Sequence, residues 1–158
     1  MGECDSRFNM RIVIVLLSAF LIQGCNTTKN PNEYDRYIKS VDSEVVTYYK
    51  DGTVKTKMPL KKGFKDGVAY SYHPNGTKRS EITYKDDKLN GIQKLWYNNG
   101  VLKSEESIKN NIKHGFSKYF HKEGWLLREF FSDNGETVWF VLYNKDGSVD
   151  YKSKKKSE

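Results

Sequence analysis

The chain of 158 residues contains only two cysteines, Cys4 and Cys25. Two cysteines are too few for a disulfide framework or for a cysteine-based metal site. The sequence also lacks a nucleophile motif, a phosphate-binding loop and any metal-ligand spacing. It therefore predicts that the protein is not an enzyme, with no catalytic residues, no metal, no cofactor and no small-molecule substrate.

Long apolar runs are also missing. The longest run of apolar or small residues, Ile12 to Ile22, has eleven residues, whereas a membrane-spanning helix needs about 20. That length fits the apolar region of a secretory signal peptide. The run ends in Ile22-Gln23-Gly24-Cys25, which resembles the cleavage motif of bacterial lipoproteins. The resemblance implies lipidation of Cys25; the alternative is a buried apolar strand at the amino terminus.

Glycine is present in an ordinary amount, but its positions are periodic. Seven of the twelve glycines lie on two rows with a spacing of 24 residues, Gly52, Gly76, Gly100 and Gly124 on one row and Gly67, Gly91 and Gly115 on the other. A fixed period in this range indicates a repeat architecture. Such proteins present a long surface rather than one deep pocket, which favours a binding module over an enzyme.

Each repeat unit contains two short alternating segments and two turns. In one unit these are Val68 to His73, a turn at Pro74-Asn75-Gly76, Thr77 to Tyr84, and a longer polar turn from Lys85 to Gly91. We expect the first turn to be the tight one, because Asn-Gly supplies the positive φ angles of tight hairpins. The sequence predicts an all-β fold, an elongated single-layer antiparallel meander of 24-residue β-hairpin repeats with about ten strands. The last unit, around Gly135 and Gly147, departs from the period and is expected to cap the sheet, although it could instead dock a partner.

The net charge is +7, and lysines gather near the end of the chain at Lys152, Lys154, Lys155 and Lys156. Lysines on an edge strand prevent sheets from pairing edge to edge, which is one explanation of their position. Contact with anionic lipid headgroups is the other. We do not expect nucleic acid as a partner, because an exported lipoprotein rarely meets it.

The three histidines do not predict a catalytic or metal site. His73 and His121 occupy equivalent positions two units apart, about 19 Å from each other, so they are too distant to share a metal ion. His114 lies in a predicted turn. Adjacent acidic pairs, such as Glu105-Glu106, point to opposite faces of a strand and make poor acid–base couples.

The aromatic content of 14% is high for so polar a chain, whose mean hydropathy is −0.78. Aromatic residues dominate protein interfaces, and we select six of them as candidate partner contacts: Tyr70, Tyr72, Trp96, Tyr97, Tyr119 and Phe120. The alternative is that the same rings only hold the sheet together.

The run from Asn99 to Glu105, followed by Lys109 to Gly115, resembles the bacterial MORN-variant repeat, and the similarity extends over about residues 48–131. Proteins with this repeat are commonly grouped as the YwqK-type antitoxin family, and many are lipoproteins. The resemblance implies a sheet of hairpins and a protein-binding role, such as an antitoxin or immunity protein that occludes a toxin. The alternative is a surface or structural module that contacts anionic lipid or wall glycan.

These observations divide the chain into four parts. We expect a lipoprotein signal peptide at residues 1–24, with Met10 as its true start, and a lipidated cysteine with a polar tether at residues 25–43. A repeat domain at residues 44–152 and a basic tail at residues 153–158 follow. The expected location is the cell envelope, where the lipid on Cys25 would anchor the protein on the non-cytoplasmic side of a bacterial membrane.

Overall fold

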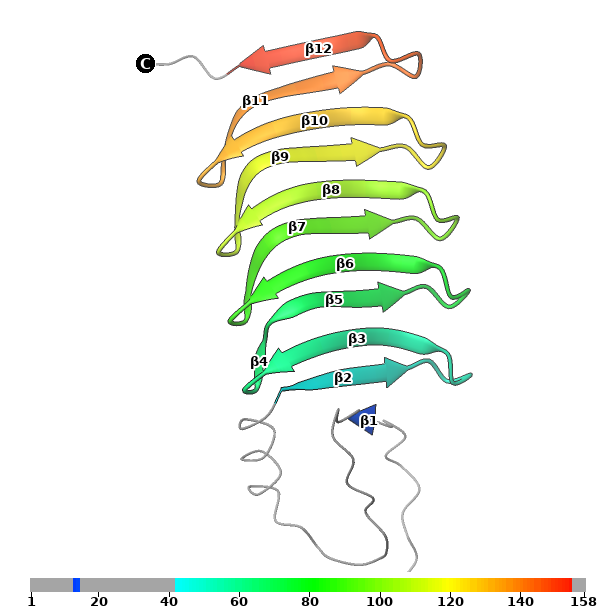
Figure 1. Cartoon of the computed structure of the whole chain (residues 1–158). Coiled ribbons are helices and arrows are strands. Elements are labelled where there is room, and N and C mark those ends of the chain that lie inside the picture. The colour runs from blue at the N-terminus through cyan, green and yellow to red at the C-terminus, as the bar shows by residue number, and fades with distance from the viewer. Residues whose placement is uncertain (1–12, 15–41, 155–158) are drawn as a thin grey trace, which may run out of the picture.

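The computed structural model describes residues 13–14 and 42–154 of the chain. These residues form one sheet in which every paired strand is antiparallel to its neighbour (Figure 1). The strand order is β1-β2-β3-β5-β6-β7-β8-β9-β10-β11-β12, and the short β4 pairs with β3 beside this path. Nowhere in the described part of the chain is there a helix long and apolar enough to cross a bilayer.

The strands follow one another up the sheet in the order of the sequence. Their bounds are β1 (Val13–Ile14), β2 (Ser43–Tyr48), β3 (Val54–Lys61), β4 (Phe64–Lys65), β5 (Gly67–Tyr72), β6 (Lys78–Lys85), β7 (Lys88–Trp96), β8 (Leu102–Lys109), β9 (Ile112–Phe120), β10 (Leu126–Asp133), β11 (Glu136–Tyr143) and β12 (Val149–Lys154). The prediction of a single antiparallel meander is confirmed, and β1 and β4, of two residues each, add to the expected strands. Of the predicted signal peptide, only Val13 and Ile14 are described; they pair with Val46 and Val45 of β2. Cys25 and the predicted tether up to residue 41 lie outside the described residues.

The expected tightness of the two turns in each unit was wrong. In the turn at residues 73–77, His73 N donates to Thr77 O and Gly76 N donates to His73 O. This is a three-residue loop in which Gly76, with φ of 81°, takes the left-handed position that follows a type I turn. The opposite turn is shorter, because Lys85 pairs with Lys88 and leaves only Asp86 and Asp87 between the strands. Both residues have positive φ, 47° and 63°, as a two-residue type I′ turn requires.

The second row of glycines lies in strands, not in turns as expected. Gly91 and Gly115 lie within β7 and β9. A Cβ at Gly91 would lie 3.0 Å from the Cβ of Thr83, and one at Gly115 would lie 3.1 Å from the Cβ of Ser107. These glycines therefore permit a close approach of neighbouring strands at the point where the pairing register of β6 with β7, and of β8 with β9, shifts.

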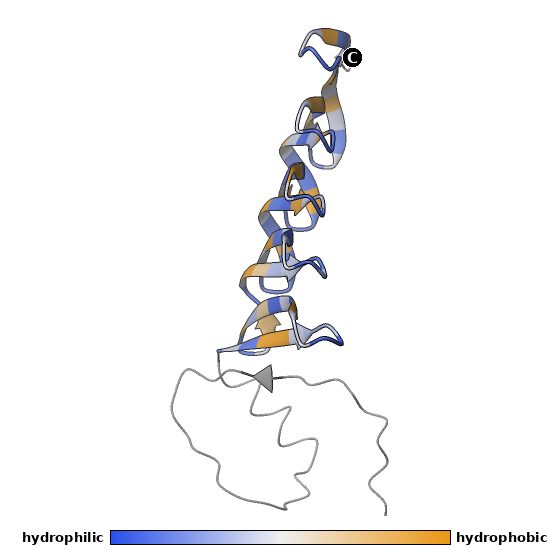
Figure 2. Cartoon of the chain, turned by 90° about the vertical axis from the view of Figure 1, so that its right-hand side faces the viewer, coloured by the Kyte–Doolittle hydropathy of each residue, from blue (hydrophilic) through white to orange (hydrophobic). Residues whose placement is uncertain are grey.

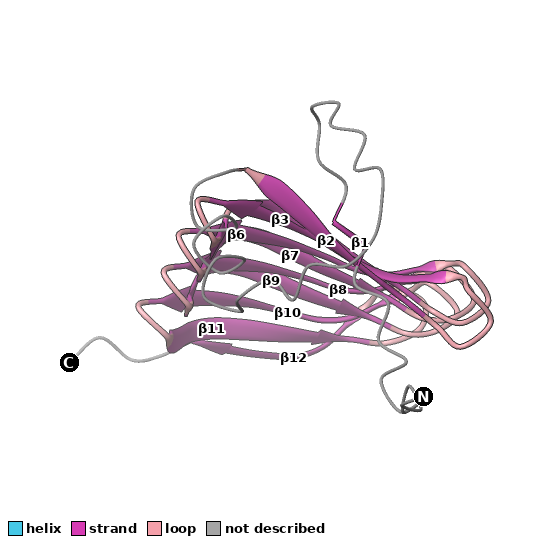
Figure 3. Ribbon diagram, turned by 90° about the horizontal axis from the view of Figure 1, so that it is seen from below, coloured by secondary structure: helices cyan, strands magenta, loops and turns pink. Residues whose placement is uncertain are grey.

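The sheet is a single layer with little core. Seen along the strands, it forms one thin stack with no second layer packed against either side (Figure 2). Seen along the stack, the strand directions fan gradually from β3 to β12, as expected of a twisted sheet (Figure 3). The buried side chains are small, Val46, Ala69 and Val141 among the apolar ones and Ser80, Ser104, Ser117 and Ser132 among the polar ones. Stability must come mainly from cross-strand contacts and backbone pairing.

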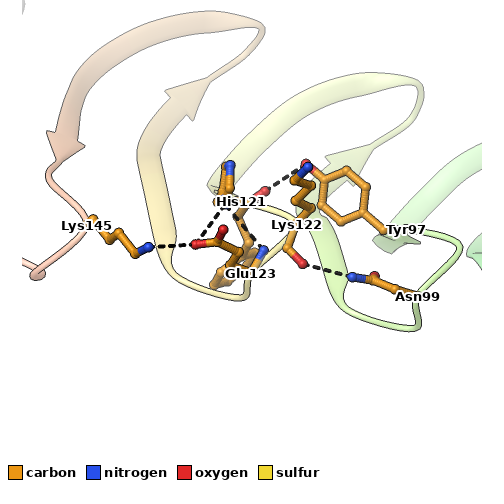
Figure 4. A network of polar contacts seen from close by, with 7 residues as sticks. Tyr97, Asn99, His121, Lys122, Glu123 and Lys145 are labelled. Carbon is orange, nitrogen blue, oxygen red and sulfur yellow. Dashed lines mark hydrogen bonds and ion pairs between the residues drawn. The ribbon is translucent and has the colours of Figure 1, made fainter.

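Side chains at equivalent positions also tie each unit to the next. The Tyr49 hydroxyl donates to Tyr72 O over 2.7 Å, and the Tyr97 hydroxyl donates to Phe120 O over 3.0 Å. His73, in the slot between them, places Nε2 3.0 Å from Trp96 O. Asn75 and Asn99 add a parallel set of bonds, since each Nδ2 donates over 2.9 Å to a backbone oxygen of the next turn. Figure 4 shows the bond from Asn99 to Lys122 O beside the one from the Tyr97 hydroxyl. His73 therefore has a structural role, linking two units.

The last unit continues the same pattern with one residue fewer. The strand β11 has eight residues, whereas the equivalent β9 has nine. Asn134 and Gly135 form the two-residue turn, and Gly147 takes the left-handed position of the three-residue loop. The irregular spacing in the sequence is thus a one-residue shortening of an otherwise ordinary hairpin.

Candidate functional site

The two faces of the sheet carry different chemistry. Because neighbouring residues of a strand point to opposite faces, the register assigns each side chain to one of them. One face, here called the serine face, carries Ser71 and Ser80, whose hydroxyls lie 2.6 Å apart, and Ser104. The other face, here called the charged face, carries a row that crosses the sheet strand by strand through Lys57, Tyr70, Glu81, Lys94, Glu105, Lys118, Glu129, Val141 and Lys152.

Charges alternate along the middle of this row. From β6 to β10 the side chains are acidic, basic, acidic, basic and acidic, and Lys94 Nζ lies 3.2 Å from a carboxylate oxygen of Glu105. Lys78, beside the row, donates to Glu81 over 2.9 Å, which raises the pKa of the lysine. Its ammonium also lies 5.0 Å from the centre of the Trp96 ring. Pairs this exposed contribute little stability each, but opposite charges at facing positions fix the register of the sheet.

An exposed apolar row runs beside the charges on the same face. Val68, Ile92 and Phe116 occupy equivalent positions 24 residues apart and are 36%, 42% and 54% exposed. Val68 is paired with Thr83, and Ile92 with Ser107; these short side chains cannot cover their apolar neighbours.

The apolar row ends in an aromatic cluster. The ring of Phe116 meets that of Phe131 edge on, with 5.2 Å between centroids, and Trp139 stacks on Phe131 at 6.2 Å. The charged face therefore presents a strip of apolar residues (Val68, Ile92, Phe116, Phe131 and Trp139) across strands β5 to β11, with Thr83 and Ser107 lying between the first three. We call it the apolar strip.

The structure separates the six aromatic residues predicted from the sequence. Four of them, Tyr70, Tyr72, Trp96 and Phe120, lie on the charged face. Tyr70 belongs to the row of charges itself, and each of the other three lies two residues after a member of that row on the same strand. Tyr119 lies on the serine face, opposite Ser104. Tyr97 lies at the end of its strand, where its hydroxyl is used in the link between units. All six are partly buried.

The apolar strip was not among the predicted contacts. The sequence does carry a signal for most of it, because an apolar residue follows directly after each glycine of the second row, at Val68, Ile92 and Phe116. Strand alternation alone could not show that these positions would be left exposed, since exposure depends on the size of the partner across the strand.

The basic residues at the end of the chain are only partly described. Lys152 lies exposed on β12, the outermost strand, and Lys154 is the last residue of that strand. Lys155 and Lys156 lie outside the described residues. Among the side chains that the structure does describe, no three His, Cys, Asp or Glu residues are grouped so that they could hold a metal ion.

Comparison with known protein families gives two matches. The MORN repeat variant matches residues 65–86 and 89–110. No curated protein matches the chain. Each matched segment covers one unit of the sheet, β5 with β6 and β7 with β8, and the hydrogen bonds between units recur beyond both ends of the matched region. Two copies of the MORN repeat variant thus lie in the middle of a longer array of similar hairpins.

Proposed function

We propose that this chain is a non-enzymatic module that binds a partner protein through the charged face of its sheet. MORN repeats are generally modules that contact proteins or membranes. The observation that carries the proposal is the apolar strip, in which Val68, Ile92 and Phe116 recur in step with the repeat and are left exposed. Exposed apolar residues that line up on one face and are bordered by charges are typical of an interaction site.

The partner would lie along the stack, across the strands. The strip and the row of alternating charges run side by side over the same strands, so that one partner can bury the apolar residues while polar groups at its margin meet Lys94, Glu105 or Lys118. An apolar centre with a polar rim is the usual arrangement of protein interfaces. Tyr70, Tyr72, Trp96 and Phe120 lie on the same face and would enlarge the contact.

In the finer form of this proposal, the protein is an antitoxin or immunity protein held in the cell envelope by a lipid on Cys25. A long, preformed sheet face can occlude a partner's active surface without chemistry of its own. The resemblance to lipoproteins of the antitoxin type, noted on the sequence, is the basis for this form.

Affinity capture from the envelope of the producing cell tests the proposal. The bait is the chain from residue 26 onward, compared with the same bait carrying Ile92→Ser and Phe116→Ser. One protein recovered in stoichiometric amount by the unaltered bait, and lost with the double variant, would support the proposal. A matched control is Tyr151→Ser, which removes an aromatic side chain as exposed as Phe116 (54%) from the opposite, serine face. Equal recovery by the unaltered bait and the double variant would exclude the apolar strip as the contact.

Contact with anionic lipid is a second candidate, favoured by the exposed Lys152 on the outermost strand. Each lysine near an anionic surface adds about 1 kcal/mol of attraction, which salt weakens. Deletion of residues 152–156 should then reduce binding to anionic vesicles at low salt. If binding is unchanged by the deletion, the lysines do not contact lipid.

A further inference from the structure

The charged face is hollowed at its carboxyl-terminal end. An open depression of about 360 Å³ is lined by Glu129, Trp139, Val141, Tyr143, Val149 and Lys152, which come from β10, β11 and β12. The register explains its shape. Val141, which is 5% exposed, forms the floor, and Glu129 and Lys152 are its partners on the two neighbouring strands.

An acid and an amine thus face each other across an apolar floor. Their strands are two spacings apart, about 10 Å, which leaves room for a ligand between the two side chains. No ion pair joins either group to another among the side chains that the structure describes. One oxygen of Glu129 accepts a hydrogen bond of 2.5 Å from the Tyr143 hydroxyl, which fixes the orientation of the carboxylate. The second oxygen, Oε2, is left for a ligand.

Two aromatic side chains close the depression along β11. Trp139 and Tyr143 lie two residues to either side of Val141, so their side chains rise on the same face. Trp139 is held in place by its stacking on Phe131, at an interplanar angle of 11°. Aromatic walls favour a ligand that offers flat apolar C–H surface, while the acid and the amine need hydroxyl or amide groups as partners.

The charges of the depression oppose each other, so a ligand with a net charge of either sign is attracted by one group and repelled by another. A cationic ligand would be attracted by Glu129 but repelled by Lys152 and by Lys118, the other register partner of Glu129. An anionic ligand would be attracted by Lys152 and Lys118 but repelled by Glu129. A neutral ring bearing hydroxyl groups is repelled by neither, because its hydroxyls can donate to the carboxylate and accept from the ammonium. We therefore propose that this depression, here called the Trp139 site, is a binding site for a neutral saccharide unit.

The proposal does not depend on the protein-binding function, because the contacts that it needs come from the last three strands and share only Trp139 with the apolar strip. Its affinity should be modest. A disaccharide that places one ring in an open site is expected to bind with a dissociation constant of about 1 mM, from the affinity that small polar ligands reach per atom.

Nuclear magnetic resonance of the labelled full chain, in a detergent without a sugar headgroup, provides the test. The chain has three tryptophans, Trp96, Trp125 and Trp139, so three indole N–H signals report on separate places. The probes are diacetylchitobiose, which is neutral, chitobiose below the pKa of its amines, which is cationic, and a disaccharide of uronic acid, which is anionic. We expect the neutral probe to shift the Trp139 signal in a saturable way and to leave the other two in place, with the charged probes at least several-fold weaker.

Variants decide whether the shift comes from this site. Glu129→Gln and Lys152→Gln each remove one charged partner and should weaken binding of the neutral probe about 5- to 10-fold. Glu105→Gln is the matched control, because Glu105 holds the same slot in the preceding unit and is paired with Lys94. The proposal is overturned if no probe saturates the Trp139 signal, if a charged probe binds as tightly as the neutral one, or if Glu129→Gln and Glu105→Gln have equal effects.

Discussion

At the scale of single residues, the two rows of glycine have different physical causes. Gly100, with φ of 83°, has open space where a Cβ would stand, so only its backbone conformation requires glycine. Gly91 has φ of 129° and also lies against the Thr83 side chain, so that conformation and close approach both require it. The sequence pattern is the same for both rows, but the consequences of substitution differ.

Replacing Gly91 with alanine should therefore destabilise the sheet by about 2–3 kcal/mol, because a Cβ is disfavoured there both by φ and by the contact with Thr83. Gly100→Ala should cost only about 1 kcal/mol, the penalty of a left-handed conformation. Urea denaturation of the two variants and the unaltered chain measures the difference. Equal costs would show that the close approach at Gly91 has no energetic weight.

Acid sensitivity is also decided by single residues in the three-residue loops. Asp51 accepts hydrogen bonds from the hydroxyl and the backbone N–H of Thr53, and these bonds hold its pKa below the usual 3.8. Asp146 is arranged in the same way with Ser148, and its pKa is lowered for the same reason. In the equivalent loops, Asn75 and Asn99 accept such bonds through an amide oxygen that does not titrate.

The folded-state pKa of each aspartate lies below the unfolded value, so its contribution to stability is complete above pH 3.8 and is lost as the pH falls through the folded-state pKa. The double variant Asp51→Asn/Asp146→Asn should lose less stability on acidification than the unaltered chain, as measured by urea denaturation at a series of pH values. Asp150→Asn, an exposed carboxylate outside these loops, is the control. An identical decline in the double variant and the unaltered chain would contradict the assignment.

At the scale of the hairpin, each unit depends on the next one through its side chains as well as through the sheet. Tyr49, His73 and Tyr97 reach across the three-residue loops to the backbone of the following unit. On the opposite edge, Asn111 Oδ1 accepts from Leu89 N over 2.7 Å, and Asp87 Oδ1 accepts from Lys65 N in the same way. Both ends of every central hairpin are thus fastened to a neighbour.

Removing one of these links should cost about 1 kcal/mol, the net value of a single hydrogen bond. Tyr97→Phe deletes the bond to Phe120 O and keeps the ring, so thermal or urea denaturation should show this loss while any contact made by the ring is retained. Tyr84→Phe is the control, because its ring lies beneath Lys65 but the hydroxyl does not belong to this set of links. A loss no larger than that of Tyr84→Phe would mean that the link adds no stability.

At the scale of the whole molecule, the protein is nearly one-dimensional. Every strand makes its main contacts with its neighbours in the sheet, and the central strand pairs are almost identical in extent. The stability of such an array is close to a sum of units and of the interfaces between them. Both the apolar strip and the row of alternating charges exist only because several units are stacked in register.

Deleting one period should therefore leave a shorter sheet of the same kind. Removal of residues 92–115 joins Gly91 to Phe116, which restores the Gly-Phe step that Gly115 and Phe116 form in the unaltered chain. Circular dichroism should show a retained sheet. The slope of the unfolding free energy against urea concentration should be smaller than in the unaltered chain, because a shorter sheet exposes less surface when it unfolds. Removal of residues 92–103 instead deletes half a period and reverses the direction of every later strand, so this variant should not fold. A folded half-period variant would contradict the repeat-by-repeat description.

The sequence by itself determined the period, the antiparallel meander and its single layer. These features follow from local properties, namely strand alternation, turn residues and glycines at a fixed spacing, which recur in each unit and reinforce one another. It also determined that His73, His121 and Tyr97 are equivalent. The turn chemistry was misjudged, because Asn-Gly suits both a two-residue and a three-residue hairpin loop, and only the pairing of Lys85 with Lys88 distinguishes them.

Only the tertiary structure decided which side chains share a face and which of them are exposed. Strand alternation places Tyr119 and Phe120 on opposite faces, but the register across β8, β9 and β10 was needed to assign each to its face. Exposure of Val68 and Ile92 depends on the short Thr83 and Ser107 across from them. The Trp139 site depends on Glu129, Val141 and Lys152 meeting from three strands. The physical reason is that facing and exposure depend on pairs of residues brought together by strand register, which the local pattern of a single strand does not contain.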